Sequence, residues 1–116
     1  MKIEKELDKL WSLAIRKKGY CECCGSNKKQ LNAHHIFTRS RKATRWEISN
    51  GLCLCCGCHT LSSTLSAHKT PYEFTRFLED YKGKKWLDNL QKMSNEIYKP
   101  TKSELEETKK YLKSLI

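Results

Sequence analysis

The spacing of apolar residues near the start of the chain predicts an amphipathic helix. Apolar residues recur there at helical intervals, with charged residues between them: Ile3, Leu7, Leu10, Trp11 and Ala14. This is the pattern of a helix that buries one side against a core. We therefore predict a core-packing helix over residues 2–18, with Gly19 as its stop.

Further helices are predicted in the last third of the chain, where capping residues mark their boundaries. Thr70 stands at an N-cap position, with Pro71 first in the helix and Glu73 third. Gly83 separates this helix from a second apolar-periodic segment over residues 84–94. The charges of this region are mixed, so we expect it to be a scaffold.

A last helix is predicted after Pro100, which breaks the chain. Thr101 and Glu104 have the spacing of a capping box. One face of the helix is marked by Leu105, Thr108, Leu112 and Leu115. This face suits packing against the rest of the chain or against a partner or second copy, and periodicity does not distinguish the two.

Two short strands and a weak helix are predicted in the middle of the chain. The first strand runs from Gln30 to Ile36, and the second ends at Leu54 after a turn at Asn50 and Gly51. Helical residues follow from position 57 or 58, although Ser and Thr weaken that segment. Strands and helices in this order predict an α+β fold.

The cysteines fall into two groups within residues 21–58, and they number seven. In the first group only Cys21 and Cys24 have the two-residue spacing of a zinc knuckle, which leaves Cys23 over. A disulfide framework is the alternative. Against it, the count is odd, the cysteines are crowded, and residues 1–18 are charged throughout, without the apolar segment of a signal peptide. We therefore expect a metal site and a cytoplasmic protein.

The second group offers two possible knuckles, Cys53 with Cys56 or Cys55 with Cys58. We favour Cys55 and Cys58, because Cys53 fits the end of a buried strand as a small apolar residue. The last ligand would then lie at a helix start, which helps to stabilise a thiolate. The expected ligands of a structural zinc ion are Cys21, Cys24, Cys55 and Cys58.

Three of the four histidines lie within residues 21–59. His34 and His35 are adjacent in the predicted strand, so their side chains point to opposite faces, and one of them could be a buried, hydrogen-bonded core residue. His59 directly follows the last zinc ligand. His68 is expected to be a surface or linker residue, with an extra metal or phosphate contact as the alternative.

Together these residues resemble the motif of HNH nucleases, the ββα-metal family. The family pattern is CxxC, an Asp-His or His-His pair before an apolar residue, an Asn, and then CxxCH. Here it corresponds to Cys21–Cys24, His34-His35-Ile36, Asn50 and Cys55–His59. The resemblance covers about a third of the chain and matches both residue type and spacing.

The resemblance implies a role for each matching residue. His35 looks like the general base that activates water, and Asn50 looks like the residue that orients the loop and the base. The resemblance implies that His34 and His59 hold a catalytic divalent ion. Some relatives carry a further His four residues after the last one, where this chain has Ser63. We therefore expect an ion that keeps more water, such as magnesium or manganese.

The charge of the chain indicates a polyanionic partner. The chain has 116 residues and a formal net charge of +10, so we expect DNA binding that salt weakens. The segment from Phe37 to Trp46 is the best candidate contact, or else a solvated flexible loop, and we expect Trp46 to pack. Its basic residues are Arg39, Arg41, Lys42 and Arg45. No segment is long and apolar enough to cross a bilayer, so we expect no membrane partner.

The sequence as a whole predicts one small α+β domain. We expect an N-terminal helix over residues 1–19, a zinc-stapled, treble-clef-like ββα-metal core over residues 20–68 and a helical extension over residues 69–116. The C-terminal part weakly resembles the phage NinG and Rap recombination endonucleases, which implies branched DNA as substrate and a bacterial host cytoplasm. The predicted function is a metal-dependent DNA endonuclease, with a homodimer as one possible state. The alternative is a non-catalytic, zinc-stapled DNA-binding module.

Overall fold

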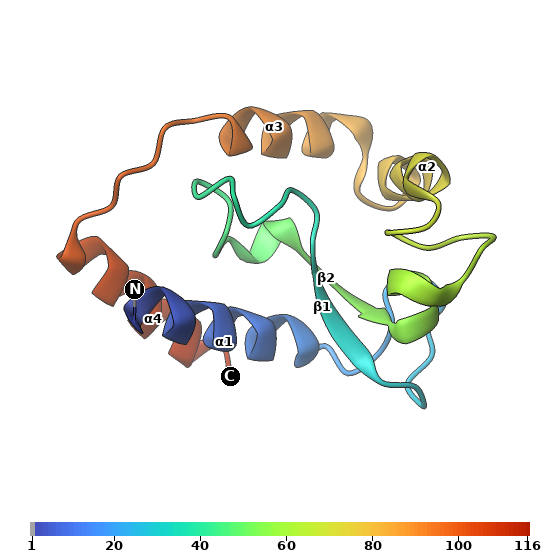
Figure 1. The fold of residues 1–116 in the computed structure, drawn as a ribbon, viewed down its shortest axis with the longest axis horizontal. Coiled ribbons are helices and arrows are strands. Elements are labelled where there is room, and N and C mark those ends of the chain that lie inside the picture. The colour runs from blue at the N-terminus through green and yellow to red at the C-terminus, as the bar shows by residue number, and fades with distance from the viewer. Residues whose placement is uncertain (1) are drawn as a thin grey trace.

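A two-stranded antiparallel sheet lies at the centre of the molecule, with helices on both sides (Figure 1). The computed structural model describes residues 2–116. It confirms a small α+β fold. The elements in order are α1 (Lys2–Arg16), β1 (Leu31–His35), η1 (Ile48–Asn50), β2 (Gly51–Cys55), η2 (Gly57–Leu61), α2 (Pro71–Lys82), α3 (Lys84–Ser94) and α4 (Lys102–Ser114).

The register of the sheet assigns its two faces to different hydrophobic clusters. Ala33 lies opposite Cys53, and His34 lies opposite Leu52. Because side chains alternate along a strand, Ala33 and Cys53 contribute to the cluster around α1, whereas Leu52 and Leu54 contribute to the cluster around α2. The sheet is thus packed on both faces, although each strand has only five residues.

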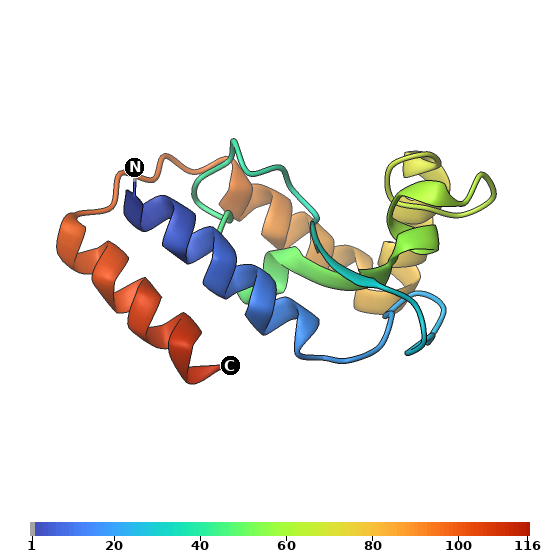
Figure 2. The same ribbon diagram turned by 60° about the horizontal axis from the view of Figure 1, so that its bottom comes forward.

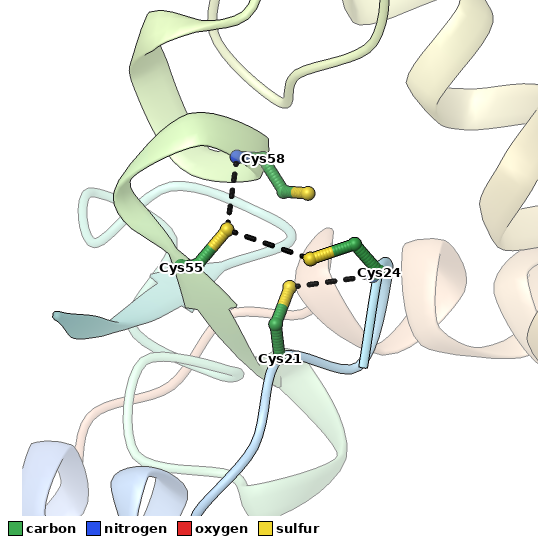
Figure 3. A group of neighbouring side chains, drawn as sticks. All are labelled: Cys21, Cys24, Cys55 and Cys58. Atoms are coloured by element: carbon green, nitrogen blue, oxygen red, sulfur yellow. Dashed lines mark hydrogen bonds between the residues drawn. The ribbon is translucent and has the colours of Figure 1, made fainter. Parts of the chain in front are cut away.

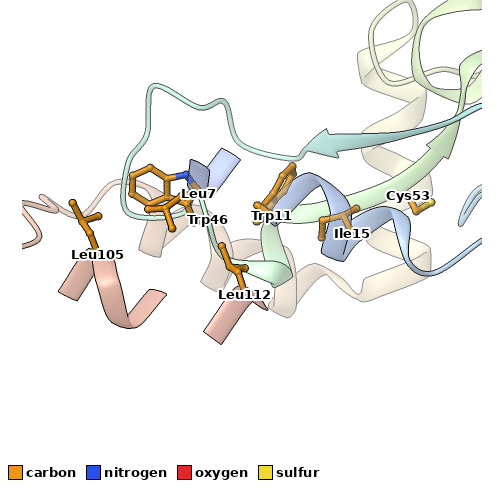
Figure 4. Packing of buried hydrophobic residues seen from close by; sticks show 7 residues of the cluster. All are labelled: Leu7, Trp11, Ile15, Trp46, Cys53, Leu105 and Leu112. Atoms are coloured by element: carbon orange, nitrogen blue, oxygen red, sulfur yellow. The ribbon is translucent and has the colours of Figure 1, made fainter. Parts of the chain in front are cut away.

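The first cluster joins the two ends of the chain (Figure 4). Leu7 and Trp11 of α1 are buried with Leu105 and Leu112 of α4. In both ribbon views α1 and α4 run side by side (Figures 1 and 2). Packing within the chain therefore explains the apolar face of the last helix, and the homodimer stays a prediction. Trp46 belongs to the same cluster and is buried, as predicted.

Gly51 is required where α1 crosses the start of β2. A Cβ atom at this position would overlap the Ile15 side chain and lie 2.8 Å from Cζ2 of Trp11. The sequence predicted Asn50-Gly51 as a turn. The structure instead ends a short 3₁₀ turn at Asn50 and begins β2 at Gly51, which lets the helix approach the strand closely.

The second cluster forms the other side of the molecule. Phe74 and Leu78 of α2 pack with Leu52 and Leu54 of the sheet. Gly83 has a φ angle of 94° and separates α2 from α3, as its position predicted. Within residues 2–116, none of the helices has the length and apolar character needed to cross a bilayer.

One of the two predicted capping arrangements is present. At α4, Oγ1 of Thr101 accepts a hydrogen bond from the Glu104 backbone at 3.2 Å, and Oε1 of Glu104 accepts one from the Thr101 backbone at 3.1 Å. At α2, Thr70 stands at the N-cap position and Pro71 begins the helix, as predicted, but the side-chain capping bond is missing. The Thr70 hydroxyl donates to the Ser66 carbonyl at 3.0 Å and accepts from the Ser66 backbone at 2.8 Å, so it does not cap its helix.

The helix expected after β2 is reduced to η2, a single π-helical turn that is wider than an α-helical one. The Ser62 backbone donates to the Gly57 carbonyl at 2.9 Å, five residues back, and η2 ends there. The Ser62 hydroxyl oxygen accepts hydrogen bonds from the Thr64 and Leu65 backbones at 3.3 and 3.2 Å. These side-chain bonds replace helical ones, which is how serine ends helices. The chain then folds back along η2.

Candidate metal centres

Four cysteines from three parts of the chain converge beside the sheet (Figure 3). Cys21 and Cys24 come from the loop after α1, Cys55 ends β2, and Cys58 lies in η2. Their sulfur atoms all lie within 4.8 Å of one another, and the Sγ atoms of Cys24 and Cys55 are 3.7 Å apart. A tetrahedron with zinc–sulfur bonds of about 2.3 Å has edges of about 3.8 Å. The four sulfurs therefore fit a structural zinc ion.

Backbone groups support the same centre. The Cys24 backbone donates to Sγ of Cys21, and the Cys58 backbone donates to Sγ of Cys55, each at 3.5 Å. Burial raises the pKa of the Cys21 thiol, but hydrogen bonds from nearby backbone groups outweigh burial and bring it to about 7. Burial and the thiols of Cys55 and Cys21 raise the pKa of Cys58. Four sulfurs this close ionise together only around a cation, so metal binding releases protons.

The structure brings together the cysteines that the sequence favoured as ligands. Cys53 is fully buried in the cluster around α1, where it serves as a small core residue. Cys23 and Cys56 stay outside the group of four. The competing register, Cys53 with Cys56, is thereby excluded.

Three histidines form a second centre on the α2 side of the sheet. His34 projects from β1, His59 follows the zinc ligand Cys58, and His68 comes from the loop before α2. One ring nitrogen from each lies within 4.8 Å of the others, and Nε2 of His68 is 3.2 Å from Nε2 of His59. Nitrogen ligands at about 2.0 Å from a tetrahedral ion are about 3.3 Å apart. The trio thus fits a divalent metal ion.

His68 was not predicted as a site residue. It reaches the centre because the chain folds back after η2, where the Ala67 backbone donates to the Cys58 carbonyl at 2.8 Å and the His68 backbone donates to the His59 carbonyl at 3.1 Å. This path depends on the wide turn and on the serines that end it, neither of which is a motif. One indication of a role for His68 was present in the sequence, because it is the only histidine that the HNH-like motif leaves without one.

The His34 ring is half-buried and neutral. It meets the rings of His59 and His68 edge-on, with centroids 5.2 Å away in each case, and Phe74 lies beyond at 6.0 Å. Burial lowers the pKa of His34 to about 3, and the neighbouring imidazoles add to this effect. Burial also lowers the pKa of His59. Neutral imidazole is the form that binds metal ions.

His35 occupies a different environment from His34. Its ring stacks on Trp11 with centroids 3.8 Å apart, and its Nε2 lies 3.0 Å from the Arg45 carbonyl oxygen. Since a carbonyl only accepts, Nε2 carries the proton and Nδ1 is left as a proton acceptor. Burial lowers the pKa of His35, so the ring is neutral near pH 7.

Asn50 holds the loop that follows His35. The side chain is fully buried, with Oδ1 2.8 Å from the Phe37 amide and Nδ2 2.9 Å from the Phe37 carbonyl. The Asn50 carbonyl also accepts from the Ile36 backbone at 2.9 Å. Asn50 therefore orders the end of β1 directly, and it acts on the His35 ring only through this backbone.

All four histidines line one cleft of about 450 Å³, with Arg39 at its edge. His34, His59 and His68 have the spacing of metal ligands, and His35 supplies a neutral imidazole. The Arg39 side chain is 65% exposed and lies 3.8 Å from Asp8. A metal ion, a proton acceptor and a cation around one opening suit the chemistry of a phosphate ester.

The other basic residues of the loop make contacts within the chain. Arg45 donates to both carboxylate oxygens of Asp8, at 3.0 and 2.7 Å, and its side chain is 16% exposed. Lys42 pairs with Glu4 at 3.2 Å. Arg41 donates to Ser94 at 3.2 Å and also to Asn95. The loop is thus fastened to α1 and α3, and its DNA contacts stay a prediction.

Comparison of the chain with protein-family models, with curated proteins and with solved structures found no match. The candidate centres therefore rest on the residues and their geometry.

Proposed function

We propose that this protein is a divalent-metal-dependent endonuclease of the HNH, or ββα-metal, type that hydrolyses phosphodiester bonds in DNA. The observation that carries the proposal is the shared cleft, in which three imidazoles that fit a metal ion and the separately held His35 face one opening. The resemblance of the sequence motif to the family supports the same assignment. A binding module needs no proton acceptor beside a metal site.

His35 acts as the general base in this proposal. The hydrogen bond to the Arg45 carbonyl fixes the tautomer, and stacking on Trp11 fixes the plane of the ring. Nδ1 is then free to take a proton from the attacking water. Arg45 is itself held by Asp8, so a carboxylate on α1 supports the base through one intervening residue.

The donor set changes the expectation about the catalytic metal. Two histidines with several waters favoured magnesium or manganese, whereas three imidazoles favour an ion that prefers nitrogen ligands, such as nickel or zinc. An ion held by His34, His59 and His68 supplies Lewis-acid stabilisation of the phosphate charge and of the leaving oxygen. A structural zinc ion held by the four cysteines would fix Cys58 and so the position of the next residue, His59.

Arg39 provides the first contact to DNA. Its guanidinium is exposed at the edge of the cleft, and arginine matches the geometry of phosphate oxygens. A formal net charge of +10 attracts DNA from a distance. Branched DNA is the expected substrate class from the weaker phage resemblance.

The test is cleavage of a labelled four-way junction and its matched duplex with magnesium, manganese, cobalt, nickel or zinc added in turn. We expect wild type to cut with at least one transition-metal ion. His35→Ala should still bind DNA and metal but cut at least about 100-fold more slowly. His68→Ala should need a higher metal concentration, which isothermal titration with the same ion would measure.

Arg76→Ala is the matched surface control, because Arg76 is exposed and lies outside the cleft. It should cut like wild type. If wild type and His35→Ala bind DNA equally and neither cuts with any of the five ions, the nuclease assignment is wrong. The chain is then a zinc-stapled DNA-binding module.

A further inference from the structure

A second cavity borders the histidine cleft. It measures about 390 Å³ and lies between the end of β1 and helices α2 and α3. His34, His35 and His68 line both openings. A nucleic-acid strand with one phosphate at the histidine centre therefore places a neighbouring nucleotide at this cavity.

The lining of the cavity is apolar on its walls. The half-buried side chains of Phe37 and Leu87 supply accessible apolar surface, and the buried Phe74 and Leu78 of α2 complete the apolar lining. Such surfaces suit the flat face of an aromatic ring. The volume also lies near the lower end of the range for small-ligand pockets, which is roughly 300 to 1,000 Å³.

The polar groups of the cavity select against a phosphate. Glu79 and Asp88 contribute carboxylates, Gln91 contributes an amide, and the single lysine, Lys84, pairs with Asp88 at 3.3 Å. The two carboxylates outnumber the lysine, although the chain as a whole is strongly basic. Lys84 offsets the charge of Asp88, which leaves one carboxylate charge in excess, and the carboxylates and the Gln91 carbonyl can accept hydrogen bonds from the amino groups of adenine, cytosine or guanine.

We propose that this cavity holds one unpaired nucleobase, next to the phosphate bound at the histidine cleft. The inference rests on the proposed function for the position of the DNA, and it narrows the substrate class. A base cannot enter while it is stacked and paired in a duplex, so it must be unpaired or turned out of the helix. DNA with a bulged or unpaired nucleotide beside the cleavage position is the substrate that fits.

The test is equilibrium binding of the full-length, zinc-loaded protein, with no other divalent ion added, to three fluorescent duplexes. One carries a single bulged adenine, the second carries an abasic unit in the same bulge, and the third is fully paired. We expect the bulged adenine to bind about tenfold more tightly than either of the others, since base–aromatic contacts contribute on that scale. The abasic bulge separates capture of the base from a preference for flexible DNA.

Two pairs of variants place the base in the cavity. Thr75 lines the cavity from an exposed position on α2, so Thr75→Met fills it without disturbing the core, and Thr75→Val is the matched control. Asp88→Asn removes a carboxylate of the cavity, and Asp80→Asn removes an exposed one outside it. We expect Thr75→Met to abolish the preference, Asp88→Asn to reduce it, and both controls to retain it.

Equal binding of the bulged adenine and the abasic bulge would overturn the proposal, as would a full preference in Thr75→Met. The binding and cleavage assays test the two proposals independently. A chain that shows the preference but cuts no DNA keeps the cavity assignment and loses the nuclease. A chain that cuts but shows no preference keeps the nuclease and loses the cavity assignment.

Discussion

The Asn50 side chain is bonded to the Phe37 backbone in both directions, with Oδ1 2.8 Å from the amide nitrogen and Nδ2 2.9 Å from the carbonyl oxygen. The two residues are 13 positions apart in the chain. This pair closes the basic loop at its base, directly beside His35. The start of the loop, at Phe37, is therefore held in place independently of the conformation of the rest of the loop.

Asn50→Ala should destabilise the protein by about 1–3 kcal/mol, because it removes the buried Asn50 amide and leaves the half-buried backbone amide and carbonyl of Phe37 without these partners. Urea denaturation at neutral pH measures the change. Asn89→Ala, at an exposed position on α3, is the control and should leave the midpoint almost unchanged. Equal midpoints for the two variants would show that Asn50 does not hold the loop.

Cys55→Ser should abolish stoichiometric zinc binding and lower the melting temperature strongly, because one of four ligands is lost from a site that supports folding. Metal analysis of the purified protein and thermal denaturation measure both effects. Cys56→Ser is the matched control, one residue away and outside the ligand group. It should retain one zinc ion per chain. Loss of zinc in both variants would contradict the assignment.

Asp8→Asn should destabilise the protein by about 1–3 kcal/mol, because Asp8 accepts charge-assisted hydrogen bonds from Arg45 and a further one from Trp46 at 2.9 Å. The His35 ring is also expected to lose order, since its carbonyl partner belongs to Arg45. Chemical denaturation measures the first effect, and the cleavage rate measures the second. Glu6→Gln, which removes an exposed ion pair with Lys109, should change neither.

The free energy of unfolding should fall as the pH is lowered from about 6.5 towards 3, in the absence of added divalent ions. Burial holds the pKa of His34 near 3, against an ordinary value of 6.5. In that window the unfolded chain binds a proton that the folded chain does not, so acid favours unfolding by up to about 1.4 kcal/mol per pH unit. Urea denaturation between about pH 7 and pH 5.5 tests this prediction. His34→Gln should flatten the dependence, and an unchanged slope would contradict the burial effect.

Arg39→Ala should weaken DNA binding and lower the salt dependence of the binding constant by about one counterion. Fluorescence anisotropy over a series of salt concentrations measures both quantities. Arg76→Ala, an exposed arginine on α2 that contacts Tyr72, is the control. If Arg76→Ala weakened DNA binding and Arg39→Ala did not, the DNA contact would lie on α2 and not at the cleft.

The zinc ligands could be predicted because their chemistry is local. Two CxxC spacings each form a knuckle, and burial of Cys53 in a strand decides between the registers. The boundaries of α1 and α4 likewise follow from periodicity and capping, although α1 ends at Arg16 rather than residue 18. In each case the residues that matter lie within a few positions of one another.

The parts that could not be predicted depend on contacts between distant residues. In the sequence Arg45 has no acidic residue nearby except Glu47, so it was predicted to contact DNA. Its partner Asp8 lies 37 residues away on α1. His68 joins the metal centre only because serine side chains end η2 and turn the chain back. Periodicity carries no information about either relationship.

Cys58 and His59 are consecutive residues that serve different centres. One peptide bond therefore connects a ligand of the candidate zinc site to a ligand of the proposed catalytic metal site. Zinc bound by the four cysteines would fix the position of Cys58 and, through the chain, the position at which His59 meets the other imidazoles. Oxidation or alkylation of one of these thiols would then inactivate the histidine cleft without modifying any of its residues. The activity of the protein would therefore depend on the supply of zinc and on the redox state of its thiols.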